Sequence, residues 1–60
     1  MTLDDFLDLI PGDQVLLAST GEHFIVDYIG EVDDRDYIVI KLPLHGDGYI
    51  LYPENHDLIL

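Results

Sequence analysis

The chain opens with an apolar pattern of helical period. Four apolar residues fall at positions i, i+3, i+4 and i+7, which places them on one helical face: Leu3, Phe6, Leu7 and Ile10. Thr2 with Asp5 three residues later forms a capping box, and Pro11-Gly12 ends the segment. The sequence therefore predicts a short helix over residues 2–10. Because so short a helix is marginal in isolation, we expect its apolar face to pack against the rest of the chain.

The remainder of the chain consists of short apolar runs separated by turn residues. Runs of Val, Ile, Leu and Tyr bounded by Gly, Pro and Asp are typical of β-strands. Gly30 indicates a bulge or bend within the longest run, and Pro43 ends a strand or marks a sheet edge. The predicted strands span residues 14–19, 23–32, 36–42, 48–52 and 57–60.

One helix and strands at about ten-residue spacing predict a mainly β fold, either a small antiparallel barrel or a bent sheet of four to five strands. The 60 residues are expected to form a single small domain, 1–60, around one core. Residues of the predicted strand 36–42 alternate between two faces, with Ile38, Ile40 and Leu42 on one and Tyr37, Val39 and Lys41 on the other. The second face is also partly apolar, so we expect the helix or a partner to cover it.

Three segments carry a resemblance to a known fold. A first strand begins at residues 12–16, a long bent hairpin passes through residues 29–32, and a short turn with a final strand spans residues 52–58. In this order they resemble small Src-homology-3-like barrels, which implies an antiparallel Src-homology-3-like barrel from Gly12 onward.

A narrower resemblance covers about half of the chain. A strand ending in Ile29-Gly30 leads to a turn, an aliphatic strand over residues 37–42, Pro43, and a loop from Gly46 to Gly48. This order is similar to the N-terminal domain that precedes PilZ domains in bacterial flagellar brake proteins. The resemblance implies a regulatory module that binds protein through strand edges. The basic motifs that contact cyclic dinucleotides in those proteins have no counterpart here, so it implies no ligand site.

The charge of the chain is strongly one-sided. It has 13 carboxylates against 2 basic side chains, a formal net charge of −11 and a pI of about 4.1. Acidic chains of low hydrophobicity are disordered, but 48% of these residues are apolar, so the chain is expected to fold. Direct binding to nucleic acid needs a basic surface, which Arg35 and Lys41 cannot form, and an anionic membrane would repel the chain.

Other chemistry finds little support in the sequence. There is no cysteine, no signal-peptide pattern and no apolar run long enough to cross a bilayer, so we expect a cytoplasmic protein without cofactor or bound metal. Asp33, Asp34 and Asp36 lack the glycine and distal glutamate of a calcium-binding loop, which makes a hairpin turn the simpler interpretation. Ser19 is the only serine, and no catalytic motif surrounds it. An enzyme is therefore not expected.

The carboxylates are the strongest functional signal. They either form a solvated surface that keeps the chain soluble or contact a basic partner. Carboxylates two apart on a strand lie about 6.7 Å apart, and those four apart on a helix about 6 Å, which suits a display of anions like that of a nucleic acid backbone. Two tyrosines, expected to point outward beside the acidic turn, would add cation–π contacts to arginine. The candidate partner-binding residues are Asp4, Asp5, Asp8, Glu31, Asp33, Asp34, Asp36, Tyr37, Asp47 and Tyr49.

These observations favour a non-enzymatic acidic binding protein. A more specific hypothesis is an inhibitor of the anti-defence type used by phages and mobile elements. Such an inhibitor imitates nucleic acid and occupies the nucleic-acid-binding surface of a basic protein. The alternative is the regulatory module that binds protein through strand edges. The sequence leaves both a monomer and a homodimer open.

Overall fold

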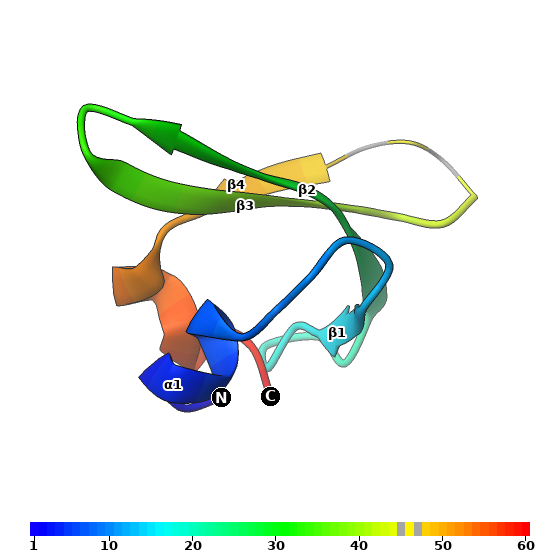
Figure 1. The fold of residues 1–60 in the computed structure, drawn as a ribbon. Coiled ribbons are helices and arrows are strands. Elements are labelled where there is room, and N and C mark those ends of the chain that lie inside the picture. Colours follow the sequence, from blue (N-terminus) through cyan, green and yellow to red (C-terminus); the bar gives the residue numbers. More distant parts are fainter. Residues whose placement is uncertain (45, 47) are drawn as a thin grey trace.

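The computed structural model describes residues 1–44, 46 and 48–60. A short helix α1 (Leu3–Leu7) precedes four strands, and a 3-10 helix η1 (Pro53–Leu58) follows them (Figure 1). The strands are β1 (Gln14–Leu16), β2 (His23–Val32), β3 (Arg35–Lys41) and β4 (Gly48–Leu51), and they form one antiparallel sheet in the order β1-β2-β3-β4. The predicted mainly β fold with a short N-terminal helix is confirmed, as an open four-stranded sheet with helical turns near both ends of the chain.

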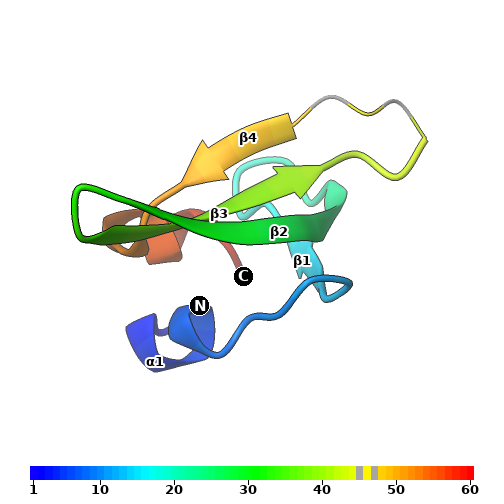
Figure 2. The same ribbon diagram turned by 45° about the horizontal axis from the view of Figure 1, so that its top comes forward.

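Strand β2 connects two parts of the sheet. Its first residues pair with β1, where Phe24 lies opposite Val15, and its later residues pair with β3 as far as Val32 opposite Arg35. A bulge shifts the register between Val26 and Tyr28. Figures 1 and 2 show β1, α1 and η1 on one side of the layer formed by β2, β3 and β4. The core lies between the two parts of the sheet that β2 connects.

The irregularity in β2 lies three residues before the position that the sequence indicates. A bulge within this strand is thus confirmed, but it lies between Val26 and Tyr28 and not at Gly30, which is regularly paired with Tyr37. A Cβ atom at Gly30 would collide with the ring of Tyr37. Glycine is required here for the close approach of an aromatic ring on the neighbouring strand.

The core lies between the inner face of the sheet and the segments beneath it. Ile40 pairs with Val26 and Ile38 pairs with Leu51, so these four side chains form the upper half of the core. Leu42 packs against its edge, which confirms the predicted inner face of β3. The remaining buried side chains are Phe6, Leu9, Val15, Phe24 and Ile59. Both helices lie on this inner side, so the prediction that the helix covers the opposite face, with Tyr37, Val39 and Lys41, is wrong.

The N-terminal helix is shorter than predicted. The Thr2 Oγ1 atom accepts a hydrogen bond from the Asp5 N–H at 3.1 Å, as the capping pattern indicates, but α1 ends at Leu7 instead of residue 10. The chain then turns, and an Asp13 carboxylate oxygen accepts the N–H of Ile10 at 3.0 Å. This turn brings Leu9 into the core. Of the predicted apolar face only one residue is buried, since Leu3, Leu7 and Ile10 are 44%, 54% and 61% exposed whereas Phe6 is 3% exposed.

The strand boundaries agree with the sequence in the centre of the sheet and differ at its ends. The strand at 23–32 is confirmed. The strand predicted at 36–42 differs by one residue at each end, and the strand predicted at 48–52 differs by one residue at its C-terminal end. The strand predicted at 14–19 ends at Leu16. The strand predicted at 57–60 is wrong: Pro53 begins η1, the Asn55 side chain accepts the Tyr52 N–H at 3.0 Å, and only Ile59 pairs with Leu17.

The two ends of the chain lie side by side beneath the sheet (Figure 1). The Leu60 N–H donates to the Leu16 carbonyl at 2.9 Å, and the Ala18 N–H donates to the Leu58 carbonyl at 2.8 Å. Nδ1 of His56 donates to the Met1 carbonyl at 2.7 Å. These bonds connect α1, β1 and η1 into one layer. No helix in residues 1–44, 46 and 48–60 has the length and apolar character needed to span a membrane.

Candidate functional site

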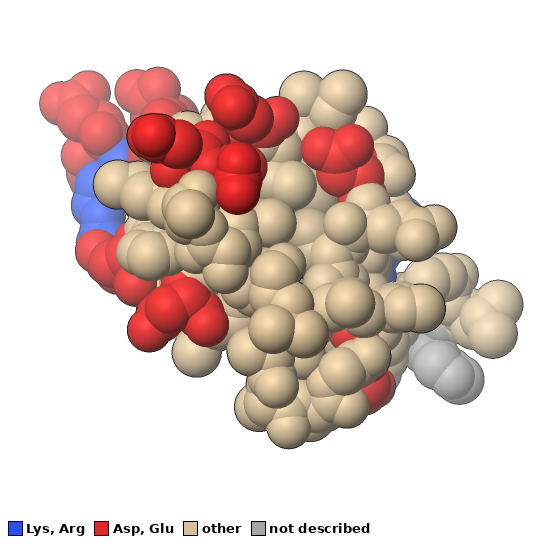
Figure 3. Space-filling model, turned by 90° about the horizontal axis from the view of Figure 1, so that it is seen from below, with Lys and Arg blue, Asp and Glu red and all other residues tan. Residues whose placement is uncertain are grey.

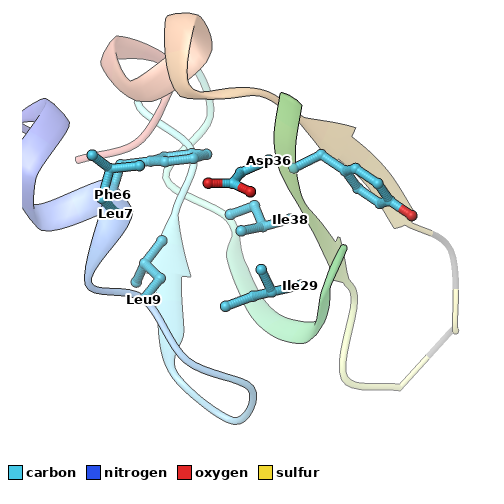
Figure 4. Close-up of a pocket in the computed structure, with 7 residues that line it drawn as sticks. Phe6, Leu7, Leu9, Ile29, Asp36 and Ile38 are labelled. Atoms are coloured by element: carbon cyan, nitrogen blue, oxygen red, sulfur yellow. The ribbon is translucent and has the colours of Figure 1, made fainter. Parts of the chain in front are cut away.

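A cavity of about 130 Å³ lies between α1 and the inner face of the β2–β3 hairpin. Side chains two apart on a strand share a face, so Asp36 points to the same side of β3 as the buried Ile38. Figure 4 shows the Asp36 carboxylate directed toward Phe6, among apolar side chains from both elements. The cavity therefore combines apolar walls with one carboxylate at its rim. Its lining residues are Phe6, Leu7, Leu9, Ile29, Asp36, Tyr37 and Ile38.

The end of the β2–β3 hairpin is densely acidic. Glu31 and Asp36 lie directly opposite each other, and the two-residue loop between Val32 and Arg35 consists of Asp33 and Asp34. We call this set, Glu31, Asp33, Asp34 and Asp36, the acidic hairpin end. All four residues are exposed. The sequence prediction of a hairpin turn here is confirmed.

The acidic hairpin end is arranged at a cost in stability. Like charges directly opposite each other on neighbouring strands repel. Asp33 and Asp34 both have positive φ angles, 50° and 62°, in a loop type that prefers Asn-Gly or Asp-Gly. Aspartate tolerates this conformation better than most residues, but glycine adopts it without penalty. The hairpin thus retains carboxylates where other residues would give a more stable structure.

Both basic side chains of the sequence are already engaged within the chain. Arg35 forms an ion pair with Glu54, and its guanidinium lies 4.4 Å from the centre of the Tyr52 ring. Lys41 pairs with Asp27 at 3.0 Å. In the part of the chain that the structure describes, the other carboxylates have no lysine or arginine partner. The negative charge of the hairpin is therefore left for solvent or for another molecule.

Other predicted carboxylates lie on the helix that forms one wall of the cavity. Asp4 and Asp5 occupy the first turn of α1 and Asp8 caps its last turn, and all three are exposed. Seen from below, the molecule carries most of its visible carboxylates along one side, next to a centre formed mainly by uncharged residues and histidine (Figure 3). Asp47, also predicted to contact a partner, lies outside the described residues.

The two predicted tyrosines do not lie together. Tyr49 pairs with Ile40, toward the far end of β3, and packs edge-on against Phe24 with ring centres 5.6 Å apart. Its predicted position next to the acidic turn is wrong. Tyr37 is half-buried on the opposite face of the sheet, where it contacts Tyr28 and Tyr52 with ring centres 6.4 and 6.2 Å apart. Tyr49 is thus not a neighbour of the acidic loop. Tyr37, which follows Asp36 in β3, lies on the outer face of the sheet, with its ring packed against two other tyrosines.

Sequence reasoning missed the apolar wall of the site and the role of Tyr52. Leu7 and Ile29 belong to patterns that indicate a core, yet both are partly exposed and line the cavity. Tyr52 receives the cation–π contact that was assigned to a partner's arginine, because the strand register brings Arg35 over its ring. No signal in the sequence marks either feature, since the cavity depends on how α1 packs below the sheet and the Arg35–Tyr52 contact depends on the pairing of β3 with β4.

The cavity has the chemistry of a receptor for a long cationic side chain. Lysine and arginine bury an aliphatic stem along apolar surface while the charged group stays at the rim, where a carboxylate can pair with it. A cavity of roughly 150 Å³ can hold a group the size of benzene, so the volume here suits one such side chain. Among the described residues, no three carboxylate or histidine side chains converge as a metal site would require.

Comparison with known proteins identifies no relative of this chain. No family model, no curated protein and no solved structure matches this chain. Its function is therefore argued from the geometry and charge of the residues themselves.

Proposed function

We propose that this protein is a non-enzymatic binding protein that presents the acidic hairpin end and the adjoining cavity to a basic partner protein. The observation that carries the proposal is the position of Asp36 at the rim of an apolar cavity, where no lysine or arginine among the described residues pairs with its carboxylate. A lysine or arginine of the partner would place its stem against Phe6 and Leu7 and its cation beside Asp36.

Several contacts are needed for such a complex. An exposed ion pair contributes only about 0–1 kcal/mol, so Asp36 by itself could not hold a partner. The neighbouring carboxylates of the acidic hairpin end and of α1 add further pairs and raise the rate of encounter with a positive surface. The apolar walls contribute affinity that does not depend on salt.

The partner best suited to this surface is a protein whose basic surface binds nucleic acid. Such surfaces carry lysine and arginine placed for a row of phosphates. The carboxylates of the acidic hairpin end follow one another closely along two adjacent strands and their loop, and they can occupy the same basic side chains. This supports an inhibitor that competes with DNA or RNA, of the kind by which phages and mobile elements counter host defence.

The test is capture of partners from a lysate of the host cell on the immobilised full chain, followed by stepwise elution with NaCl. We expect a basic nucleic-acid-binding protein that is retained at low salt, released well below 1 M NaCl and displaced by added duplex DNA. The screening length falls from about 10 Å at 0.1 M salt to about 3 Å at 1 M, which removes most of the attraction.

A matched pair of variants links the partner to the cavity. Asp36→Asn removes the rim carboxylate, and Asp57→Asn removes another exposed carboxylate, on η1, that does not line the cavity. The amount of captured partner protein should fall several-fold with Asp36→Asn and change little with Asp57→Asn. Equal effects of the two variants, retention through 1 M salt, or no captured protein would each contradict the proposal.

A further inference from the structure

A second surface of interest lies at the free edge of the sheet. Strand β4 pairs with β3 on one side only, and the described residues provide no strand on its other side (Figure 2). An edge strand offers alternate N–H and C=O groups to any chain that comes alongside. Natural proteins protect such edges with lysine, proline or a bulge, but β4 consists of Gly48, Tyr49, Ile50 and Leu51 and has none of these.

An open apolar groove follows this edge. It has a volume of about 410 Å³ and lies between β4 and the turn that follows β1, with Leu17 and Leu58 on its far side. Tyr49, Ile50 and Leu58 are 56%, 57% and 48% exposed, although they are large apolar or aromatic side chains. The groove is thus the gap that remains between the two ends of the open sheet.

We propose that this groove binds an extended segment of the partner protein, which adds a strand to β4. Neighbouring strands lie about 4.8 Å apart, so a chain paired with β4 would place every second side chain into the groove and the others toward solvent. The inward side chains would be apolar, because they meet Leu17, Tyr49 and Leu58.

The net charge of −11 favours basic side chains at the outward positions of this segment. Glu22, in the wall of the groove, has no lysine or arginine partner among the described residues and adds to this negative charge. A second copy of this chain would bring another net charge of −11 to the same place, so self-pairing of β4 is opposed by repulsion. The occupant is therefore a segment in which apolar residues alternate with lysine or arginine. This inference rests on the proposed function in one respect, the basic character of the partner.

The experiment uses the full ¹⁵N-labelled chain and blocked synthetic peptides as probes. The first peptide is an octapeptide of alternating valine and lysine, the second has the same sequence with alternate backbone nitrogens methylated, and the third is octalysine. We expect the first peptide to shift the amide signals of Tyr49, Ile50 and Leu51. It should slow exchange with deuterated water only for the alternate amides that point to the free edge. The methylated peptide should do neither, because it cannot complete the ladder of hydrogen bonds.

Two isoleucines provide a matched pair of variants. Ile50→Lys places a charge on the free edge, whereas Ile10→Lys makes the same change at an isoleucine of similar exposure that does not line the groove. Binding of the alternating peptide should weaken about tenfold or more in the first variant and stay within about twofold of the unmodified chain in the second. Thermal melts of both variants identify any loss of folding.

The outcomes separate this inference from the proposed function. Peptides that bind only at the acidic hairpin end, with equal affinity for both variants, would overturn strand docking and leave the proposed function standing. An alternating peptide that docks on β4 equally well at low salt and at 1 M salt, with no binding of octalysine anywhere, would support strand docking and overturn the proposed function. Binding of the methylated peptide at β4 as tightly as its parent would overturn strand docking.

Discussion

Glu31 and Asp36 lie directly opposite each other across the β2–β3 hairpin, and both are exposed. The pair repels in the absence of a partner and would gain from a cation placed between the two carboxylates. This relationship explains how a surface can cost stability in the free protein and serve binding in a complex.

Reversal of one charge in this pair should stabilise the protein. We expect Glu31→Lys to raise the free energy of unfolding by about 0.5 kcal/mol at low salt, because an attractive cross-strand pair replaces a repulsive one. Glu22→Lys is the matched control, since it changes the net charge equally at an exposed position outside the sheet. Urea denaturation measures both variants. An equal gain in the two variants would mean that only the net charge matters.

The hairpin loop offers a test of backbone strain. The double substitution Asp33→Asn and Asp34→Gly supplies the residues that a loop with two positive φ angles prefers. We expect a gain of about 1 kcal/mol, from release of conformational strain and of like-charge repulsion together. Glu22→Gln with Asp57→Asn removes the same charge from two exposed positions elsewhere, and it should give a clearly smaller gain. Thermal or urea unfolding that ranks the two double variants equally would rule out strain in the loop.

The contact between Gly30 and Tyr37 can be measured with a double-mutant cycle. Gly30→Ala should cost about 1–3 kcal/mol, because the new methyl group displaces the Tyr37 ring from its place against β2. In a chain that already carries Tyr37→Ala, the same substitution should cost little, since the space is then empty. A cost that is unchanged by removal of the ring would place the role of Gly30 in the backbone conformation instead.

Salt should stabilise the free protein. Both cations are already paired, and the remaining carboxylates of the described chain mainly repel one another. Screening lengths fall from about 30 Å at 0.01 M salt to about 10 Å at 0.1 M, so the repulsion across the molecule weakens. We expect the melting temperature to rise by several degrees over this range, where about 1 kcal/mol corresponds to about 4–8 °C for a domain of this size. A constant or falling melting temperature would show that repulsion among these carboxylates has no net effect on folding.

The sequence predicted the central strands well because their signals are local. The strand signal at 23–32 and the alternation of two faces along residues 36–42, one of them with Ile38 and Ile40, are readable from residues that lie next to one another. The same kind of reasoning failed for the helix, where Ile10 fits the apolar period and yet is exposed while Leu9 is buried. That outcome depends on the turn after α1, in which the Ile10 N–H donates a hydrogen bond to Asp13, and no periodic pattern reports this turn.

For the candidate site, too, some features could be predicted from the sequence and others required the tertiary structure. The acidic character of Glu31, Asp33, Asp34 and Asp36 is evident from their order in the chain. Their relation to a cavity is not, because it requires α1 to lie against the inner side of the hairpin. Tyr37 and Tyr49 could not be placed relative to the hairpin without knowledge of the strand register.

The sequence by itself determined the sign and size of the charge, the mainly β class and the positions of the inner strands, because composition and short-range periodicity suffice for these. Only the tertiary structure decided that the sheet stays open, that Tyr52 and Glu54 engage Arg35, and that the last segment forms η1 with a single bridge from Ile59 to Leu17. The physical reason is distance along the chain. Contacts between residues tens of positions apart depend on how all the elements pack together, and no local pattern specifies them.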